Sequence, residues 1–143
     1  MITNNGQITD KPAISRQLDE RVLALMSILP GAIDTVMTRR AKLITEIEQL
    51  KLEGVTNATP YYKGGVYLVL VHPTDVCGHR KREYIGADPD KIRIALARVE
   101  RFQRYQSLKN ELATLNSRMQ QAEESLVNVF RALRIEVPFW ARL

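Results

Sequence analysis

Apolar residues recur at alternating steps of three and four residues along the C-terminal part of this chain. The series consists of Tyr105, Leu108, Leu112, Leu115, Met119, Ala122, Leu126, Val129 and Leu133. This 3.5-residue period is typical of an α-helix that lays one seam against neighbouring helices. Neither Gly nor Pro occurs between Pro89 and Pro138, so the sequence predicts one helix from Pro89 to about Arg134. At 1.5 Å per residue, that helix is about 70 Å long.

Three residues mark the start of this helix. Asp88 suits the N-cap, Pro89 suits the first helical position, and Asp90 suits the positive end of the helix dipole. The seam slips in phase between Phe102 and Tyr105. Such a slip either overwinds a coiled coil or marks a change of packing partner, and the sequence leaves open whether the helix continues past Phe102.

The N-terminal part of the chain predicts two further helices. Residues 1–12 are polar and predict a flexible arm, and the next helix runs from about Ala13 to Leu29. Pro30-Gly31 is expected to break it, and a second helix is expected from about Ile33 to Glu53, with Gly54 as its stop. The apolar face of the first consists of Ile14, Leu18, Val22, Leu25 and Leu29, and the seam of the second consists of Ile33, Val36, Leu43, Ile47 and Leu50, interrupted by Arg40.

A β segment separates the second predicted helix from the third. The run Val66–Val71 is β-branched and aromatic, and Arg80–Ile85 is the expected return strand. The residues between them, 72–79, predict a loop, and the hairpin spans about residues 61–86. Alternation places Arg80, Arg82 and Tyr84 on one face of the return strand and Lys81, Glu83 and Ile85 on the other.

These elements predict an α+β fold that is mostly α. We expect an antiparallel helical coiled coil, with a two- to three-stranded β-hairpin inserted between the second and third helices, in a single domain over residues 13–136. The third helix has more seam than one partner covers, so a homodimer is expected. The dimer or partner interface is expected to comprise Leu112, Leu115, Met119 and Leu126, with Phe139 and Trp140 from the aromatic tail 137–143, which either caps the helices or docks in a partner.

The charge of the chain favours an acidic partner. The net charge is +5 and the sequence pI is about 9.6, and cations gather around the hairpin. Phosphate contacts are expected from Arg80, Lys81, Arg82, Lys91 and Arg93. Two alternatives stay open, which are a solvated charged turn and a contact with protein. The tyrosines at 61, 62, 67 and 84 are expected to pack on the helix beneath the sheet more often than to stack on bases.

Residues that support catalysis or metal binding are few. Cys77 is the single cysteine, so no intrachain disulfide forms. With His72 and His79 it lacks the fourth ligand of a structural zinc site, so no metal and no cofactor are expected. No motif for phosphate cradling, paired carboxylates or metalloprotease chemistry occurs, and we expect neither an enzyme nor a small-molecule substrate. Without a signal peptide or an evident membrane span, we expect a cytoplasmic protein that does not contact membranes.

The segments Tyr61–Leu68, His79–Gly86 and Asp88–Ile92 carry a resemblance. Together they are similar to a small uncharacterised domain family of bacterial phages and plasmids, in which a tyrosine-rich strand, a basic strand and a long final helix follow one another. The resemblance covers about residues 40–115. The hairpin also resembles, more loosely, the arm-type DNA-binding domain of tyrosine integrases, although its loop is longer than a tight turn. The first function hypothesis is a DNA-binding accessory protein of a mobile element, positioned by its basic hairpin and dimerised by its long helix. A protein-interaction module, as a coiled-coil adaptor or an inhibitor of a host complex, is the alternative.

Overall fold

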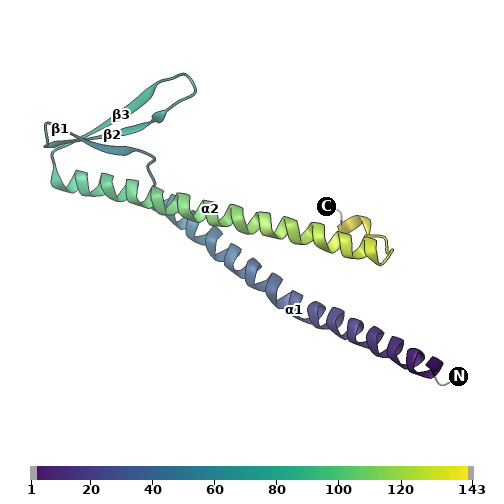
Figure 1. Cartoon of the computed structure of the whole chain (residues 1–143). Helices are drawn as coiled ribbons and strands as arrows, with labels where there is room; N and C mark the ends of the chain where they lie inside the picture. Colours follow the sequence, from purple (N-terminus) through teal and green to yellow (C-terminus); the bar gives the residue numbers. More distant parts are fainter. Residues whose placement is uncertain (1–2, 142–143) are drawn as a thin grey trace. The chain divides into compact units, whose positions relative to one another are not determined.

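The protein is mostly helical, and an antiparallel sheet comes between two long helices in chain order (Figure 1). The computed structural model describes the backbone of residues 3–141 and the side chains of residues 13–141. Its elements are α1 (Thr3–Glu53), β1 (Thr59–Lys63), β2 (Tyr67–Thr74), β3 (Arg80–Gly86), α2 (Pro89–Ala132) and the 3-10 helix η1 (Phe139–Ala141). This confirms the α+β class and the position of the sheet. The chain forms two compact units, Met1–Arg39 and Arg40–Leu143.

Helix α1 is continuous over 51 residues, so the prediction of a break at Pro30-Gly31 is wrong. It also includes residues 3–12, where an arm was expected. A proline inside a helix removes one hydrogen bond and costs about 3 kcal/mol. Each further residue that joins an existing helix adds a hydrogen bond without a new nucleation cost. The helical residues on both sides of Pro30 therefore outweigh one local defect.

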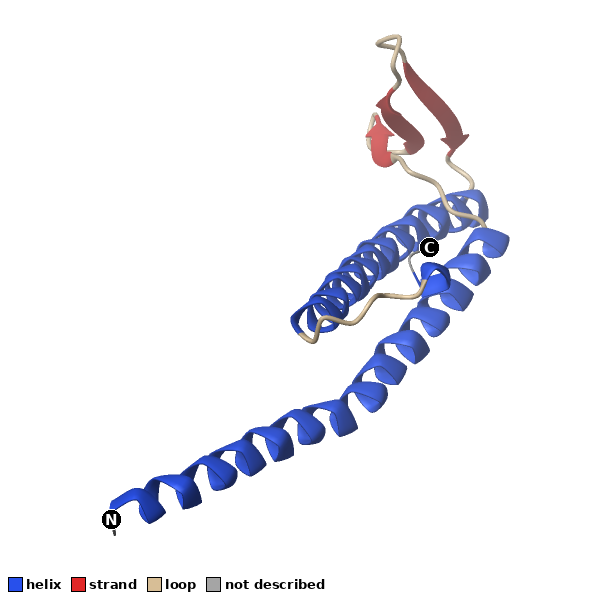
Figure 2. Cartoon of the chain, turned by 90° about the vertical axis from the view of Figure 1, so that its right-hand side faces the viewer, coloured by secondary structure: helices blue, strands red, loops and turns tan. Residues whose placement is uncertain are grey.

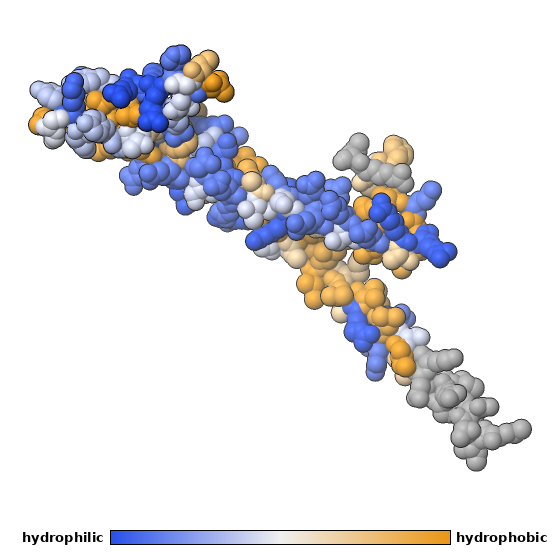
Figure 3. Space-filling model, turned by 45° about the horizontal axis from the view of Figure 1, so that its top comes forward, coloured by the Kyte–Doolittle hydropathy of each residue, from blue (hydrophilic) through white to orange (hydrophobic). Residues whose placement is uncertain are grey.

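Apolar side chains of the first unit are exposed along α1 (Figure 3). The most exposed are Leu23 at 67%, Leu25 at 69% and Ile28 at 66%. The segment Ala13–Glu53 contains an 18-residue window with a mean hydropathy of 1.3, none of it buried, and is thus long and apolar enough to cross a membrane. We expected no segment with the length and apolar composition of a membrane span, and that expectation is wrong. Soluble core helices and signal sequences pass the same test, so the lack of membrane contact stays a prediction.

In the second unit, the end of α1 pairs with α2. Arg40 donates a hydrogen bond to Asn116 at 3.3 Å, and Arg104 forms an ion pair with Glu46 at 2.9 Å. The two helices run antiparallel here, because partners that come later in α1 lie earlier in α2. Their packing as a coiled coil stays a prediction. Apolar residues on both helices are buried, including Leu43, Ile47, Leu108 and Leu115. Arg40, the polar interruption of the predicted seam, thus has a polar partner.

The end of α1 and the start of α2 are also capped as the sequence predicts. Gly54, with a φ of 96°, ends α1 and donates its N–H to the carbonyl of Leu50 at 3.1 Å. At α2, the carboxylate of Asp88 accepts the N–H of Asp90 at 3.0 Å, and Pro89 occupies the first turn. Helix α2 then passes Phe102 and Tyr105 without interruption.

The sheet has strand order β1-β2-β3, with both pairs antiparallel. Leu68 and Leu70 of β2 are fully buried and pack with Ala95 and Val99 of α2. At roughly 2 kcal/mol for each buried leucine, this contact fixes one face of the sheet against the helix. Figure 2 shows the strands in red beside the N-terminal end of α2.

The connection between β2 and β3 is shorter than predicted, because β2 continues to Thr74. The carboxylate of Asp75 accepts the N–H groups of Cys77 and His79 at 2.9 and 2.8 Å, and its own N–H donates to the carbonyl of His79 at 2.8 Å. These bonds close a compact turn. The pairing is irregular between Val71 and Thr74, where the register shifts.

Candidate nucleic-acid interface

One face of the sheet packs on α2, and the other carries aromatic and basic side chains. Because side chains alternate along a strand, the burial of Leu68 and Leu70 against α2 puts Val69 and Val71 on the opposite face. We call this opposite side the open face. It consists of Tyr61 and Lys63 from β1, Tyr67, Val69 and Val71 from β2, and Arg80, Arg82 and Tyr84 from β3.

The strand register aligns these residues in rows across the sheet. Tyr61, Val69 and Tyr84 form one row, and Val71 lies opposite Arg82 in the next. The rings of Tyr67 and Tyr84 are nearly parallel, with an interplanar angle of 25° and centroids 6.4 Å apart. Val69 is 8% exposed and forms the floor between the rings. The result is an aromatic surface on the side of the sheet away from α2.

The open face lines a broad groove with a volume of about 910 Å³. Val69 and Val71 of β2 line it together with Lys63, Arg80 and Arg82. These three cations are exposed, and the Nε of Arg80 donates to the hydroxyl of Thr74 at 3.2 Å. Figure 3 shows strongly hydrophilic side chains beside apolar ones on the sheet. None of the described strand residues of the open face is acidic, so the groove favours an anionic ligand.

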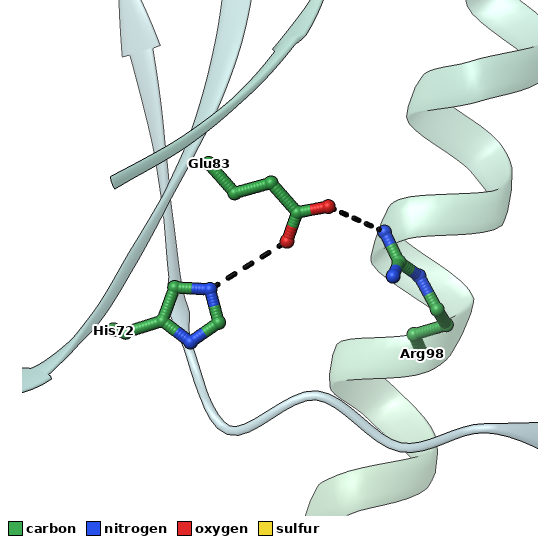
Figure 4. Close-up of polar contacts among 3 residues, drawn as sticks. All are labelled: His72, Glu83 and Arg98. Carbon is green, nitrogen blue, oxygen red and sulfur yellow. Dashed lines mark hydrogen bonds and ion pairs between the residues drawn. The ribbon is translucent and has the colours of Figure 1, made fainter. Parts of the chain in front are cut away.

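The opposite face of β3 is held to α2 by charged groups. Glu83 accepts a hydrogen bond from Arg98 at 3.2 Å, and His72 Nε2 lies 3.5 Å from the other carboxylate oxygen (Figure 4). Burial alone would raise the pKa of Glu83, but the hydrogen bond and charge of Arg98, together with those of His72, lower that pKa below its ordinary value. The only acidic residue of β3 is thus turned away from the open face.

The structure separates the five cations that were predicted to contact phosphates. Arg80 and Arg82 share the open face, whereas Lys81 alternates to the opposite side of β3. Lys91 and Arg93 lie in the first turns of α2, and no described contact joins them to the open face. Arg93 is exposed and forms an ion pair with Asp90 at 3.8 Å.

Three arginines farther along α2 make contacts within the folded chain. Arg98 binds Glu83, Arg104 binds Glu46, and Arg101 donates to the carbonyls of Gly54 and Glu53 at 2.7 and 3.1 Å. Arg101 thereby satisfies carbonyl groups at the C-terminus of α1, where a cation is favoured. These three side chains connect α2 with β3 and with the end of α1.

Sequence reasoning missed Lys63 and assigned the tyrosines to the wrong environment. Tyr61, Tyr67 and Tyr84 were expected to pack on a helix, but they are 59%, 47% and 63% exposed on the open face. Alternation along the predicted return strand placed Tyr84 with Arg82, and the same alternation along β1, which was not predicted as a strand, would have placed Tyr61 with Lys63. The sequence did not indicate which face α2 covers.

The remaining predicted site residues lie elsewhere. Leu115 is buried within the single chain at 7% exposure, so it is not available to a partner. Leu112, Met119 and Leu126 are half-buried on α2, and Phe139 and Trp140 are exposed at 84% and 67%. Residues 142 and 143 of the tail lie outside the described residues. Among the described side chains, no three His, Cys, Asp or Glu residues cluster in a way that could hold a metal ion.

Comparisons with known proteins found no match. No protein-family model, no curated protein and no solved structure matches the chain. The chemistry of the open face is therefore the basis on which a function is proposed.

Proposed function

We propose that this protein is a non-enzymatic nucleic-acid-binding accessory protein of a mobile element. It contacts nucleic acid through the open face of its sheet and dimerises through its long helices. The mobile-element context rests on the resemblance of residues 40–115 to proteins of phages and plasmids. The binding function rests on the side chains of the open face.

One observation carries the binding function. Three exposed tyrosines and three exposed cations share one face of the sheet, and the only carboxylate of its third strand, Glu83, lies on the other face. Cations neutralise phosphates and release their counterions, and aromatic rings stack on bases. A nucleic acid uses both kinds of group at once, because each of its nucleotides carries a phosphate and a base.

Dimerisation is supported by apolar residues that the single chain leaves exposed. Ile14, Leu18, Val22 and Leu25 lie on one stripe of α1 and are 64%, 51%, 52% and 69% exposed. Their spacing of three and four residues matches a helix-to-helix seam. Each leucine buried by a second copy contributes roughly 2 kcal/mol. A coiled coil between two copies therefore accounts for the stripe.

The second candidate function is a protein-interaction module, and the C-terminal tail favours it. Helix α2 is followed by Arg134, which has a φ of 57°, and η1 then presents Phe139 and Trp140 to solvent. Exposed aromatic residues of this kind serve as anchors in partner pockets. Under this alternative the protein is an adaptor without nucleic-acid contact.

A binding assay with matched charge variants separates the two functions. Affinity for random duplex and single-stranded DNA would be measured at about 50 mM and about 200 mM salt. The variant Arg80→Gln with Arg82→Gln removes two charges from the open face. The variant Lys91→Gln with Arg93→Gln removes the same charge from α2 and serves as the control.

We expect the open-face variant to bind more weakly and to reduce the salt slope by about one for each phosphate that it no longer neutralises. The α2 variant should stay close to the wild type. If the wild type does not bind at the lower salt concentration, the nucleic-acid function is wrong and the adaptor function leads. If both variants weaken binding equally, binding is not localised to the open face.

A further inference from the structure

We infer that the open face binds single-stranded nucleic acid, with unpaired bases stacked on its tyrosines. This inference rests on the proposed function, because it specifies which nucleic acid the same face takes. It goes beyond a general attraction to phosphates, for which the cations alone would suffice.

The tyrosines of the open face lie among its cations. Tyr61 and Tyr84 flank Val69 in one row of the sheet, and Tyr67 lies beside Tyr84. The row spans three neighbouring strands, so the two outer positions are about 10 Å apart. Lys63 and Arg82 stand on the same face as these rings. A nucleic-acid strand that crosses the sheet therefore meets rings for its bases and cations for its phosphates.

A duplex offers little to such a surface. Bases in a duplex are stacked on each other and paired, so their faces are not accessible to a protein ring. A duplex is read through phosphates and base edges instead. Exposed rings on the outer face of a sheet suit bases that have left a helix, and sheets of this kind stack about two or three bases each.

The open face also has room for bases. Side chains of α2 that contact the sheet, including Ala95, Arg98 and Val99, lie against its opposite face. The groove over the open face has a volume of about 910 Å³, which is large enough for several base rings. Tyr61 and Tyr84 keep more than half of their surface exposed, at 59% and 63%. These rings are thus positioned for a ligand and contribute little to the folded core.

The experiment compares ring removal with a matched control. Fluorescence anisotropy would measure binding of a labelled single-stranded DNA, a single-stranded RNA of the same sequence and length, and the corresponding duplex DNA. The test variant is Tyr61→Leu with Tyr84→Leu, which removes two rings and keeps apolar volume. The control is Tyr62→Leu, because Tyr62 pairs with Leu68 and faces the α2 side of the sheet while being 44% exposed. The variant Tyr61→Phe with Tyr84→Phe retains both rings.

We expect the wild type to bind at least one single strand more tightly than the duplex. The leucine variant should lose about tenfold or more of its single-strand affinity, since each stacked base contributes strongly. The phenylalanine variant and Tyr62→Leu should stay within about threefold of the wild type, because stacking needs the ring and not the hydroxyl. Circular dichroism of each variant checks that the fold is retained.

Two outcomes would overturn the inference. If the duplex binds at least as tightly as both single strands, or if the leucine variant binds single strands like the wild type, the tyrosines do not stack on bases. In those cases a loss of duplex binding in the Arg80→Gln, Arg82→Gln variant would leave the proposed function intact. If none of the three nucleic acids binds at low salt, both the function and the inference are wrong.

Discussion

The Glu83 carboxylate of β3 accepts a hydrogen bond from the Arg98 guanidinium of α2 at 3.2 Å. This bond joins the inner face of the sheet to the helix beneath it, beside the buried contact of Leu70 with the same helix. Because alternate residues of β3 point in opposite directions, the same register directs Arg82 and Tyr84 to the open face. The ion pair therefore helps to determine which residues of β3 lie on the open face, where a ligand can contact them.

The first prediction concerns the stability that this pair contributes. Glu83→Gln should lower the free energy of unfolding by about 1 kcal/mol, because the side chains of Glu83 and Arg98 are 34% and 31% exposed and water screens part of their attraction. Urea unfolding monitored by circular dichroism measures the change. Asp90→Asn breaks the exposed pair with Arg93 and is the control, with a change well below that of Glu83→Gln. Equal effects of the two substitutions would contradict the role of the Glu83 pair.

The second prediction concerns pH. The folded protein lowers the pKa of Glu83 below its ordinary value of 4.5. A carboxyl with a lowered pKa adds stability above its unfolded pKa, and this contribution is lost as the pH falls through the folded pKa. The stability difference between the wild type and Glu83→Gln should therefore be full at neutral pH and shrink below pH 4.5. Urea unfolding across this range tests it, and a difference that grows toward low pH would show that the sign is wrong.

The third prediction concerns assembly. Light scattering at micromolar concentration should give the mass of a dimer for the wild type. Leu18→Glu with Leu25→Glu places two charges on the exposed stripe of α1 and should yield a monomer with unchanged helix content. The control is Ser15→Glu with Gln17→Glu, which adds the same charge to polar positions of α1. A monomeric wild type would rule out the stripe as a dimer seam.

Flotation with lipid vesicles separates self-association from membrane binding by the same helix. The apolar residues of α1 that are exposed also include Leu23, which lies outside the stripe. We expect the wild type to stay with the soluble fraction, since a dimer seam requires only one stripe. Flotation of the wild type that is abolished in the Leu18→Glu, Leu25→Glu variant would instead assign the helix to lipid.

The fourth prediction uses two glycines at contrasting positions, one at the end of α1 and one inside it. Gly54 ends the helix with a φ of 96°, and Gly54→Ala should cost about 1 kcal/mol because a side chain is disfavoured there. Crowding adds little, since an added Cβ meets its nearest neighbour, Arg101, at 3.9 Å. Gly31 lies inside the helix with no neighbour within 4 Å, and Gly31→Ala should stabilise by about 0.5–1 kcal/mol. Thermal unfolding of both variants should show shifts of opposite sign.

The sequence by itself determined the elements whose signals are local. Asp88 and Pro89 marked the start of α2, Gly54 marked the end of α1, and the lack of breakers set the length of α2. Each of these signals acts within a turn or two of helix, so neighbouring residues are enough to predict it. The alternation of Arg82 with Glu83 was readable for the same reason. Pro30 was misleading, because its local cost was outweighed by the cooperativity of a helix that extends far on both sides.

Only the tertiary structure decided which face of the sheet is open. Strand β2 is apolar on both sides, with Leu68 and Leu70 on one and Val69 and Val71 on the other. Its composition therefore does not say which side α2 covers. The choice is made by contacts distant in sequence, the packing of Leu70 with Val99 in one buried cluster and the bond of Glu83 to Arg98. Because side chains alternate between the two faces along each strand, the choice of the face that α2 covers fixes the face of every other side chain in the sheet. The same choice therefore placed Tyr61, Lys63 and Tyr84 together on the open face.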